Sequence, residues 1–244
     1  MKFIITLITC LYATFSHAAF WWEKVEVVDY LVNATNPIKV PIDKELQSNP
    51  SPTIILAHGC NGINGQDYGW VKLLHKAGYN IIVPDSLSPR NVRTTCNRRA
   101  VTYEQRADDI NTIAKWVKQQ SWHSGPVIGI GFSHGAASVL EAGMSVNTPL
   151  NAVVAYYPWC KLSYKHVQVP SQIHIGALDT WTPSANCEAI KDYNMNQKVF
   201  VYDNAYHSFD RYYNTMSNGH YLQFDQAAYE KSKELTLQFI KSIQ

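Results

Sequence analysis

The stretch Gly131-Phe132-Ser133-His134-Gly135 has a glycine two residues before and two residues after its serine. The apolar run 126–130 in front of it predicts a buried strand, and the run 136–142 behind it predicts a helix. So tight a turn between strand and helix leaves no room for side chains at the two flanking positions, which explains both glycines. This arrangement is typical of a nucleophile elbow, in which a strained serine projects its hydroxyl above a sheet. We therefore expect Ser133 to be a nucleophile.

Strands and helices alternate along most of the chain. The expected strands are 24–32, 53–57, 79–84, 126–130, 152–156, 171–176 and 198–202, with a further edge strand around 38–40. The expected helices are 70–78, 103–120, 136–142, 184–193 and 226–243, and 212–224 is aromatic and irregular. This alternation predicts a mostly parallel sheet flanked by helices, with functional residues at the carboxyl ends of its strands. A length of 244 residues fits one such α/β domain without a large cap.

Serine is a weak nucleophile at neutral pH, so it needs a base within reach and a carboxylate to orient that base. His207 lies in the loop after the last central strand, and we expect it to be the base. Asp179 directly follows the strand before that and is the expected acid, with Asp203 and Asp210 as alternatives. The resulting order of serine, acid and histidine is the one found with nucleophile elbows. The other histidines that follow the serine are His134, His166, His174 and His220.

An attacked carbonyl develops negative charge on its oxygen, which needs backbone donors nearby. The residue after the serine, His134, is one expected donor through its N–H. The second is expected from His58-Gly59-Cys60, which follows the strand at 53–57. Cys60 is therefore predicted to act through its backbone N–H and not as a thiol nucleophile.

Several short stretches form a recognisable combination: His58-Gly59-Cys60, Pro84-Asp85-Ser86, Gly131-Phe132-Ser133-His134-Gly135, Tyr157-Pro158, Gly176-Ala177-Leu178-Asp179 and His207-Ser208-Phe209. Together they resemble the dienelactone hydrolase family of α/β-hydrolases, from about residue 53 to the C-terminus. The resemblance implies an α/β-hydrolase fold and a triad of Ser133, Asp179 and His207. The namesake enzymes of the family are cytoplasmic and use cysteine, whereas this chain has a serine and an export signal. Its pattern is closer to that of the exported serine esterase-like members.

The expected activity is hydrolysis of a small carboxylic ester through an acyl-enzyme, without a metal or an organic cofactor. A peptidase or an acyltransferase on the same scaffold is one alternative. Peptidases of this fold often carry an added propeller or cap, for which this chain has no room. A non-catalytic binding protein that kept the fold is another alternative, and the complete set of triad and oxyanion residues argues against it.

Aromatic residues after strand ends and in the loop after the expected base are candidates for the rim of a substrate pocket. They are Tyr157, Trp159, Trp181, Tyr206, Tyr212 and Tyr213, and ordinary packing is the alternative for each. Arg90 and Arg93 are candidates to bind a substrate carboxylate, because guanidinium groups form charge-assisted contacts with carboxylates. The alternative for both arginines is a solvated loop.

The N-terminal residues predict export. Lys2 is followed by an apolar run at 3–15 and by small residues up to Ala18, so residues 1–18 are expected to be a cleaved signal peptide. The alternative is a membrane anchor, although the apolar run is short for a stable span. Cleavage would leave a domain at 19–244 in the periplasm or outside the cell and lower the formal charge from +2 to +1. That charge predicts no binding to nucleic acid or to a membrane surface.

Four cysteines remain after Cys10 is removed with the signal peptide. In an exported chain they suggest two disulfides, and the lack of a C-x-x-C pair argues against a zinc site. Cys60 and Cys96 follow neighbouring strands of the expected sheet, and Cys160 and Cys187 follow the two strands after the elbow. We therefore predict the pairs Cys60–Cys96 and Cys160–Cys187, with four buried free thiols as the alternative.

Overall fold

A central sheet runs through the computed structural model, which describes residues 23–33, 36–97, 100–191 and 193–243. Its strands are β1 (Glu23–Asn33), β2 (Asn36–Glu45), β3 (Ser51–Ala57), β4 (Asn80–Pro84), β5 (His123–Phe132), β6 (Ala152–Tyr156), β7 (Ser171–Gly176) and β8 (Gln197–Tyr202). The helices are α1 (Gly65–Lys76), α2 (Tyr103–Val117), α3 (His134–Met144), α4 (Ser184–Glu188) and α5 (Gln226–Ser242), with 3₁₀ turns η1 (Ser88–Arg90) and η2 (Leu162–His166). The expected signal peptide lies outside the described residues.

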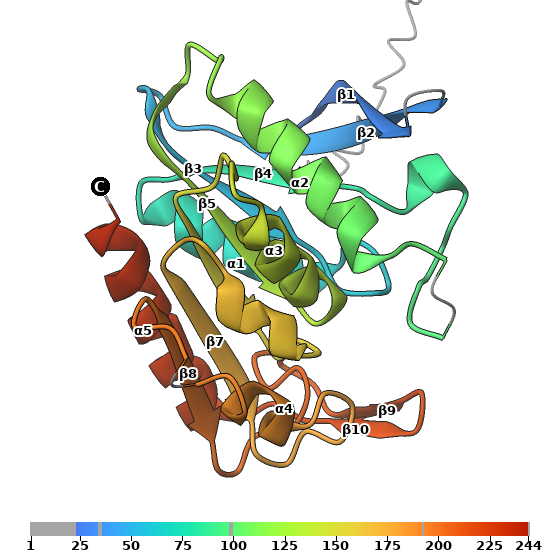
Figure 1. Ribbon diagram of the computed structural model, residues 1–244, viewed down its shortest axis with the longest axis vertical. Coiled ribbons are helices and arrows are strands. Elements are labelled where there is room, and N and C mark those ends of the chain that lie inside the picture. The colour runs from blue at the N-terminus through green and yellow to red at the C-terminus, as the bar shows by residue number, and fades with distance from the viewer. Residues whose placement is uncertain (1–22, 34–35, 98–99, 192, 244) are drawn as a thin grey trace, which may run out of the picture.

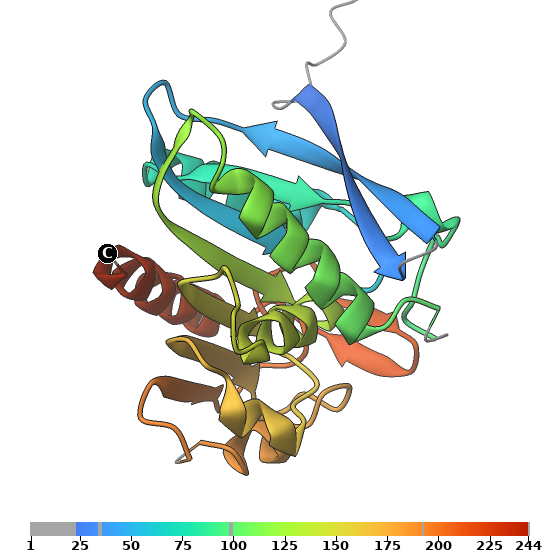
Figure 2. The same cartoon turned by 45° about the horizontal axis from the view of Figure 1, so that its top comes forward.

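The eight strands are ordered β1-β2-β4-β3-β5-β6-β7-β8. β2 pairs antiparallel with β1 and with β4, and every pair from β4 to β8 is parallel. Helices α2 and α3 cover one face of the sheet, while α1 and α5 lie on the other (Figures 1 and 2). The predicted fold class, a mostly parallel sheet flanked by helices in a single domain, is confirmed.

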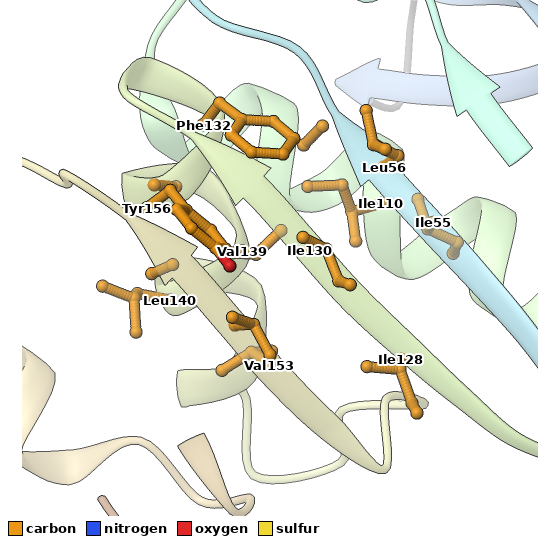
Figure 3. Packing of buried hydrophobic residues seen from close by; sticks show 14 of the residues in the cluster. Ile55, Leu56, Ile110, Ile128, Ile130, Phe132, Val139, Leu140, Val153 and Tyr156 are labelled. Carbon is orange, nitrogen blue, oxygen red and sulfur yellow. The ribbon is translucent and has the colours of Figure 1, made fainter. Parts of the chain in front are cut away.

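The core lies between the central strands and the helices on both faces. Strands buried on both faces need continuous apolar runs, and β3, β5 and β6 provide them. Ile55, Ile130 and Val153 lie on three adjacent strands and are fully buried (Figure 3). Phe132, the residue before the serine, and Tyr156 of the adjacent strand pack with ring centroids 5.3 Å apart. The strand that leads into Ser133 is therefore paired with β3 on one side and with β6 on the other.

Two helices differ in extent from the prediction. α1 begins at Gly65, earlier than expected, because Asn64 and Asp67 form a capping box in which each side chain accepts from the other's backbone N–H. α4 ends at Glu188, five residues earlier than the expected helix end at Tyr193. Ile190 is the last buried side chain in this segment and Tyr193 is exposed, so a longer helix would have no apolar face to pack. Among the described helices, none combines the length and apolarity needed to cross a bilayer.

The segment 212–224, expected to be irregular, contains a short hairpin of β9 (Thr215–Ser217) and β10 (His220–Leu222). Its turn is formed by Asn218 and Gly219, both with positive φ, as a two-residue hairpin turn requires. A bridge between His207 and Leu222 joins the hairpin to the loop of the expected base. The Asn-Gly pair was the sequence signal for this element.

Candidate active site

Ser133 occupies the turn between β5 and α3, with φ 52° and ψ −114°. Positive φ is strained for a residue with a side chain, and here a bond from its N–H to the carbonyl oxygen of Tyr156 at 2.9 Å holds the turn. A Cβ atom on Gly131 would lie 2.3 Å from the carbonyl oxygen of Gly135, and one on Gly135 would lie 2.1 Å from that of Ala57. The predicted need for glycine at both positions is confirmed.

Ser133, His207 and Asp179 form a continuous hydrogen-bonded chain. The Oγ of Ser133 lies 3.0 Å from Nε2 of His207. The opposite ring nitrogen of His207, Nδ1, lies 2.7 Å from Oδ2 of Asp179. The three side chains come from the carboxyl ends of β5, β8 and β7, and the imidazole and carboxylate are buried. The sheet thus brings together the three residues that the sequence analysis selected.

The carboxylate of Asp179 is held by the loop that follows it. Oδ1 accepts hydrogen bonds from the backbone N–H groups of Trp181 and Thr182, both at 2.8 Å. Oδ2 accepts from the hydroxyl of Thr182 at 2.7 Å in addition to the bond from His207. These donors fix the carboxylate in the orientation that meets Nδ1. Thr182 was not singled out in the sequence, although an aspartate at the start of a loop is known to accept hydrogen bonds from the backbone that follows it.

The alternative acids lie elsewhere. Asp210 is buried and accepts from Trp70 Nε1 at 2.8 Å, from the Tyr157 hydroxyl at 2.8 Å and from Gln66 at 2.7 Å. Burial raises the pKa of Asp210, and these three donors oppose that effect. Asp203 is exposed. The structure therefore places Asp179, and neither alternative, against the imidazole.

The other histidines are also accounted for. His174 is buried between the rings of Tyr156 and Phe200, as expected for a core residue, and burial lowers its pKa to about 3. His166 is exposed, and His220 stacks on Trp181 with a centroid distance of 5.1 Å. The imidazole next to the serine, His134, points away from it toward α2.

The two segments expected to supply oxyanion donors are linked by Arg106 of α2, a residue that the sequence analysis missed. This fully buried guanidinium donates from Nη2 to the carbonyl oxygen of His58 at 2.7 Å and from Nη1 to Nδ1 of His134 at 3.1 Å. Burial, reinforced by the charge of Arg106, lowers the pKa of His134 to about 2, so this imidazole is neutral and accepts the bond. Burial also lowers the pKa of Arg106 to about 10, which leaves it charged at neutral pH.

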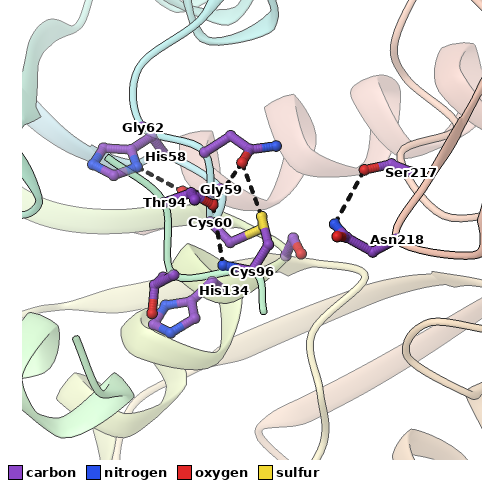
Figure 4. The surroundings of a disulfide bond; sticks show 12 residues. His58, Gly59, Cys60, Gly62, Thr94, Cys96, His134, Ser217 and Asn218 are labelled. Atoms are coloured by element: carbon purple, nitrogen blue, oxygen red, sulfur yellow. Dashed lines mark hydrogen bonds between the residues drawn. A yellow bond between two sulfur atoms is a disulfide. The ribbon is translucent and has the colours of Figure 1, made fainter. Parts of the chain in front are cut away.

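Two disulfides join cysteines of the described chain, and both have the predicted pairing. One joins Cys60 to Cys96, beside His58, Gly59 and His134 (Figure 4). It takes the thiol of Cys60 out of consideration as a nucleophile. The other disulfide joins Cys160 to Cys187 and so links the loop after β6 to α4.

Two pockets open beside the serine and share Cys60, Ser133 and Trp181 as walls. The first, here called the aromatic pocket, has a volume of about 340 Å³, and its other walls include Val101, Tyr103, Glu104, His134, Trp159 and Lys161. The second, here called the polar pocket, has a volume of about 250 Å³, and its other walls include Asn61, Asn64, Gln66, His207, Arg211 and Ser217. The hairpin of β9 and β10 closes one side of the polar pocket.

Four of the aromatic residues expected at a substrate rim border these pockets. Trp159 lines the aromatic pocket, Trp181 lines both, and Tyr157 and Tyr213 line the polar pocket. Tyr157 is buried, and its ring packs edge-on against His207 with a centroid distance of 4.7 Å, so it also supports the imidazole. Tyr206 is not among the described walls of either pocket and packs against Tyr221 instead.

The expected role of the two loop arginines needs correction. Arg90 forms a bidentate ion pair with Asp109 of α2, at 2.8 and 3.0 Å, and also donates to the carbonyl oxygen of Ser86. Its guanidinium is thus committed to anchoring the loop after β4. Arg93 is exposed and lies on no described wall of either pocket. The arginine that does line the polar pocket is Arg211, four residues after His207, which the sequence analysis missed.

The family model that matches this sequence is that of the dienelactone hydrolase family, over residues 42–244. The chain belongs to the dienelactone hydrolase family. It is therefore a hydrolase with the α/β-hydrolase fold, and membership of this family implies a small-molecule substrate. No curated protein matches the sequence significantly.

Solved structures resemble the chain in fold. A dienelactone hydrolase-like promiscuous phosphotriesterase from metagenomic libraries has 20% identity and a TM-score of 0.68 over 89% of this chain and 97% of its own. An esterase from Pyrococcus furiosus has 18% identity and a TM-score of 0.66 over 90% of each chain. Esterase 2 from Thermogutta terrifontis, in a structure phosphorylated by paraoxon, has 16% identity and a TM-score of 0.65 over 91% of this chain and 95% of its own.

Proposed function

We propose that this member of the dienelactone hydrolase family is a serine hydrolase that cleaves small carboxylic esters through an acyl-enzyme. The observation that carries the proposal is the hydrogen-bonded chain from Ser133 through His207 to Asp179, which ends between two pockets. A serine in this setting can pass its proton to a buried imidazole that a carboxylate already orients.

Each step follows from the positions of these side chains. Ser133 attacks the ester carbonyl while Nε2 of His207 takes the hydroxyl proton, and Asp179 stabilises the imidazolium through Nδ1. The N–H groups of Cys60 and His134 stabilise the oxyanion, and the positive end of the α3 dipole adds to this effect. His207 then returns the proton to the departing alcohol. Water attacks the acyl-enzyme with the same base and releases the acid.

Export of the protein is part of the proposal. Disulfides persist in oxidising compartments, and the two bridges of this chain support a periplasmic or extracellular location. Cleavage of the signal peptide after Ala18 is expected to leave Ala19 as the first residue. N-terminal sequencing of the protein recovered from the periplasm or from the culture medium tests this cleavage. An intact Met1 terminus would contradict it.

Reaction with a fluorophosphonate tests the activated serine, because phosphorylation traps the nucleophile. Two structural neighbours make this reagent class apt, since one is described as a phosphotriesterase and another as phosphorylated by paraoxon. We expect stoichiometric labelling at Ser133 and none in Ser133→Ala. Hydrolysis of short-chain esters should fall in that variant by about three orders of magnitude or more with unfolding unchanged.

The alternatives give different results in the same experiments. A non-catalytic binding protein would leave the serine unlabelled. A peptidase would be labelled but would cleave peptide amides in preference to esters. An acyltransferase would transfer the acyl group to an added alcohol faster than to water. Retention of a tenth of the esterase activity in Ser133→Ala would exclude Ser133 as the nucleophile.

A further inference from the structure

We propose that the two pockets divide the ester between them: the aromatic pocket holds the acyl group, and the polar pocket holds the leaving alcohol. This allocation rests on the proposed function and adds the substrate class. It predicts esters in which a short or flat apolar acyl group is joined to an alcohol that carries further oxygen atoms, such as a polyol.

The position of the imidazole decides which pocket receives the alcohol. The proton removed from Ser133 must be delivered to the alkoxide oxygen, so that oxygen must come within hydrogen-bond reach of Nε2 of His207. His207 and its neighbour Ser208 line the polar pocket and are not among the described walls of the aromatic pocket. The leaving alcohol therefore extends into the polar pocket.

The acyl group takes the remaining direction. A tetrahedral carbon bound to Ser133 has three other substituents: the oxyanion, the leaving oxygen and the acyl carbon. The oxyanion faces the proposed donors, the N–H groups of Cys60 and His134, and Cys60 lies on the wall that the two pockets share. With the leaving oxygen directed toward His207, the acyl carbon points into the aromatic pocket.

The aromatic pocket has the chemistry of a site for a neutral acyl group. Tyr103, Trp159 and Trp181 provide flat apolar walls. Its lysine, Lys161, is held by the carboxylates of Glu104 at 2.7 Å and Glu141 at 3.2 Å, so its charge is already balanced. A volume of about 340 Å³ suits a single ring or a short chain.

The polar pocket has the chemistry of a site for an oxygen-rich alcohol. Amide and hydroxyl side chains from the loop after β3 and from the β9–β10 hairpin line it, including Asn61 and Ser217. Arg211 adds a guanidinium that lies over the ring of Tyr213 and donates from Nη2 to the Tyr213 hydroxyl, while its buried Nε has no hydrogen-bond partner among the described residues. Such donors are suited to hydroxyl and ether oxygens of the departing alcohol.

Pre-steady-state kinetics can separate the two pockets, because the alcohol has already left when the acyl-enzyme is hydrolysed. We would measure acylation and deacylation with acetyl, butyryl and benzoyl esters, each made with p-nitrophenol, methanol and glycerol. The variants are Trp159→Ala in the aromatic pocket and Arg211→Met in the polar pocket. Tyr193→Ala is the control, since Tyr193 is exposed and lines neither pocket.

Trp159→Ala should change the deacylation rate of the benzoyl-enzyme by about fivefold or more, whichever alcohol formed it. Arg211→Met should lower acylation by glycerol esters relative to methyl esters by a similar factor and leave every deacylation rate within about twofold. Tyr193→Ala should change neither rate. Reversed effects, or deacylation rates that depend on both pockets, would overturn the allocation while leaving the esterase intact. If no acyl-enzyme and no fluorophosphonate adduct forms, the proposed function itself fails, and the allocation fails with it.

Discussion

Arg106 donates a hydrogen bond of 2.7 Å to the carbonyl oxygen of His58 and another of 3.1 Å to the ring of His134. One side chain on α2 therefore sets the distance between the loop after β3 and the first turn of α3. These are the two segments whose backbone N–H groups are proposed to stabilise the oxyanion. Arg106 touches no reacting atom in this scheme and acts as a positioning residue.

Arg106→Met should lower kcat by about 10- to 100-fold with little change in KM, because the oxyanion forms only after the substrate has bound. Arg106→Lys should recover part of this loss, since lysine retains one donor for the His58 carbonyl. Steady-state kinetics well below the unfolding temperature measures both effects. Arg93→Met, at an exposed arginine, is the matched control and should behave as wild type. A folded Arg106→Met protein with unchanged kcat would contradict the positioning role.

Substitutions in the loop after β7 are expected to lower kcat to different degrees. Asp179→Asn should lower kcat by about 10⁴-fold, because the amide cannot both accept from Nδ1 and keep the charge that stabilises the imidazolium. Thr182→Val removes the hydroxyl that donates to Oδ2 of Asp179 and should lower kcat by about tenfold. Asp203→Asn, at the exposed alternative acid, should leave kcat unchanged. A large loss in Asp203→Asn together with an active Asp179→Asn would reverse the assignment of the acid.

Because His174 is buried, we expect the free energy of unfolding to depend on pH. Burial lowers its pKa from 6.5 to about 3, so the folded protein excludes a proton that the unfolded chain binds. The contribution of the neutral, buried His174 to the free energy of unfolding is complete above pH 6.5. It falls as the pH drops toward 3, by about 1.4 kcal/mol per pH unit. Urea unfolding of wild type and His174→Gln at pH 7.5 and pH 5 should therefore show the variant gaining stability relative to wild type at the lower pH. An unchanged difference would indicate that His174 titrates normally.

We expect the disulfides to contribute to both the stability and the activity of the protein. They close loops of 36 and 27 residues, and removing either pair by double Cys→Ala substitution should lower the free energy of unfolding by about 3–4 kcal/mol. Loss of Cys60–Cys96 should also lower kcat/KM, because this bridge borders both pockets. Peptide mapping without reductant checks the pairing. A cross-linked peptide joining Cys60 to Cys160 or to Cys187 would contradict it.

Features of the site that depend on local sequence or on strand order could be predicted. The glycines around Ser133 follow from the tight turn alone, and His207 and Asp179 follow from their places after consecutive strands. The roles of Arg90 and Arg106 depend instead on contacts with distant residues. Arg90 pairs with Asp109, nineteen positions away on α2, and Arg106 reaches a carbonyl forty-eight positions earlier. The sequence alone does not show how α2 packs against the sheet, so it indicates only that an arginine in a polar loop could bind substrate.

The Cys60–Cys96 bridge also has a consequence for when the enzyme becomes active. Its two cysteines lie on the walls of the aromatic pocket, and Cys60 lies two residues after the His58 carbonyl that Arg106 of α2 holds, so the bridge links this wall to the loop after β3 only after oxidation. A chain that folds in a reducing cytosol would form the same core but would lack the bridge that holds this wall of the aromatic pocket beside Ser133. We therefore expect the proposed hydrolytic activity to be complete only once this bridge has formed, in the oxidising compartment to which export is proposed to carry the chain.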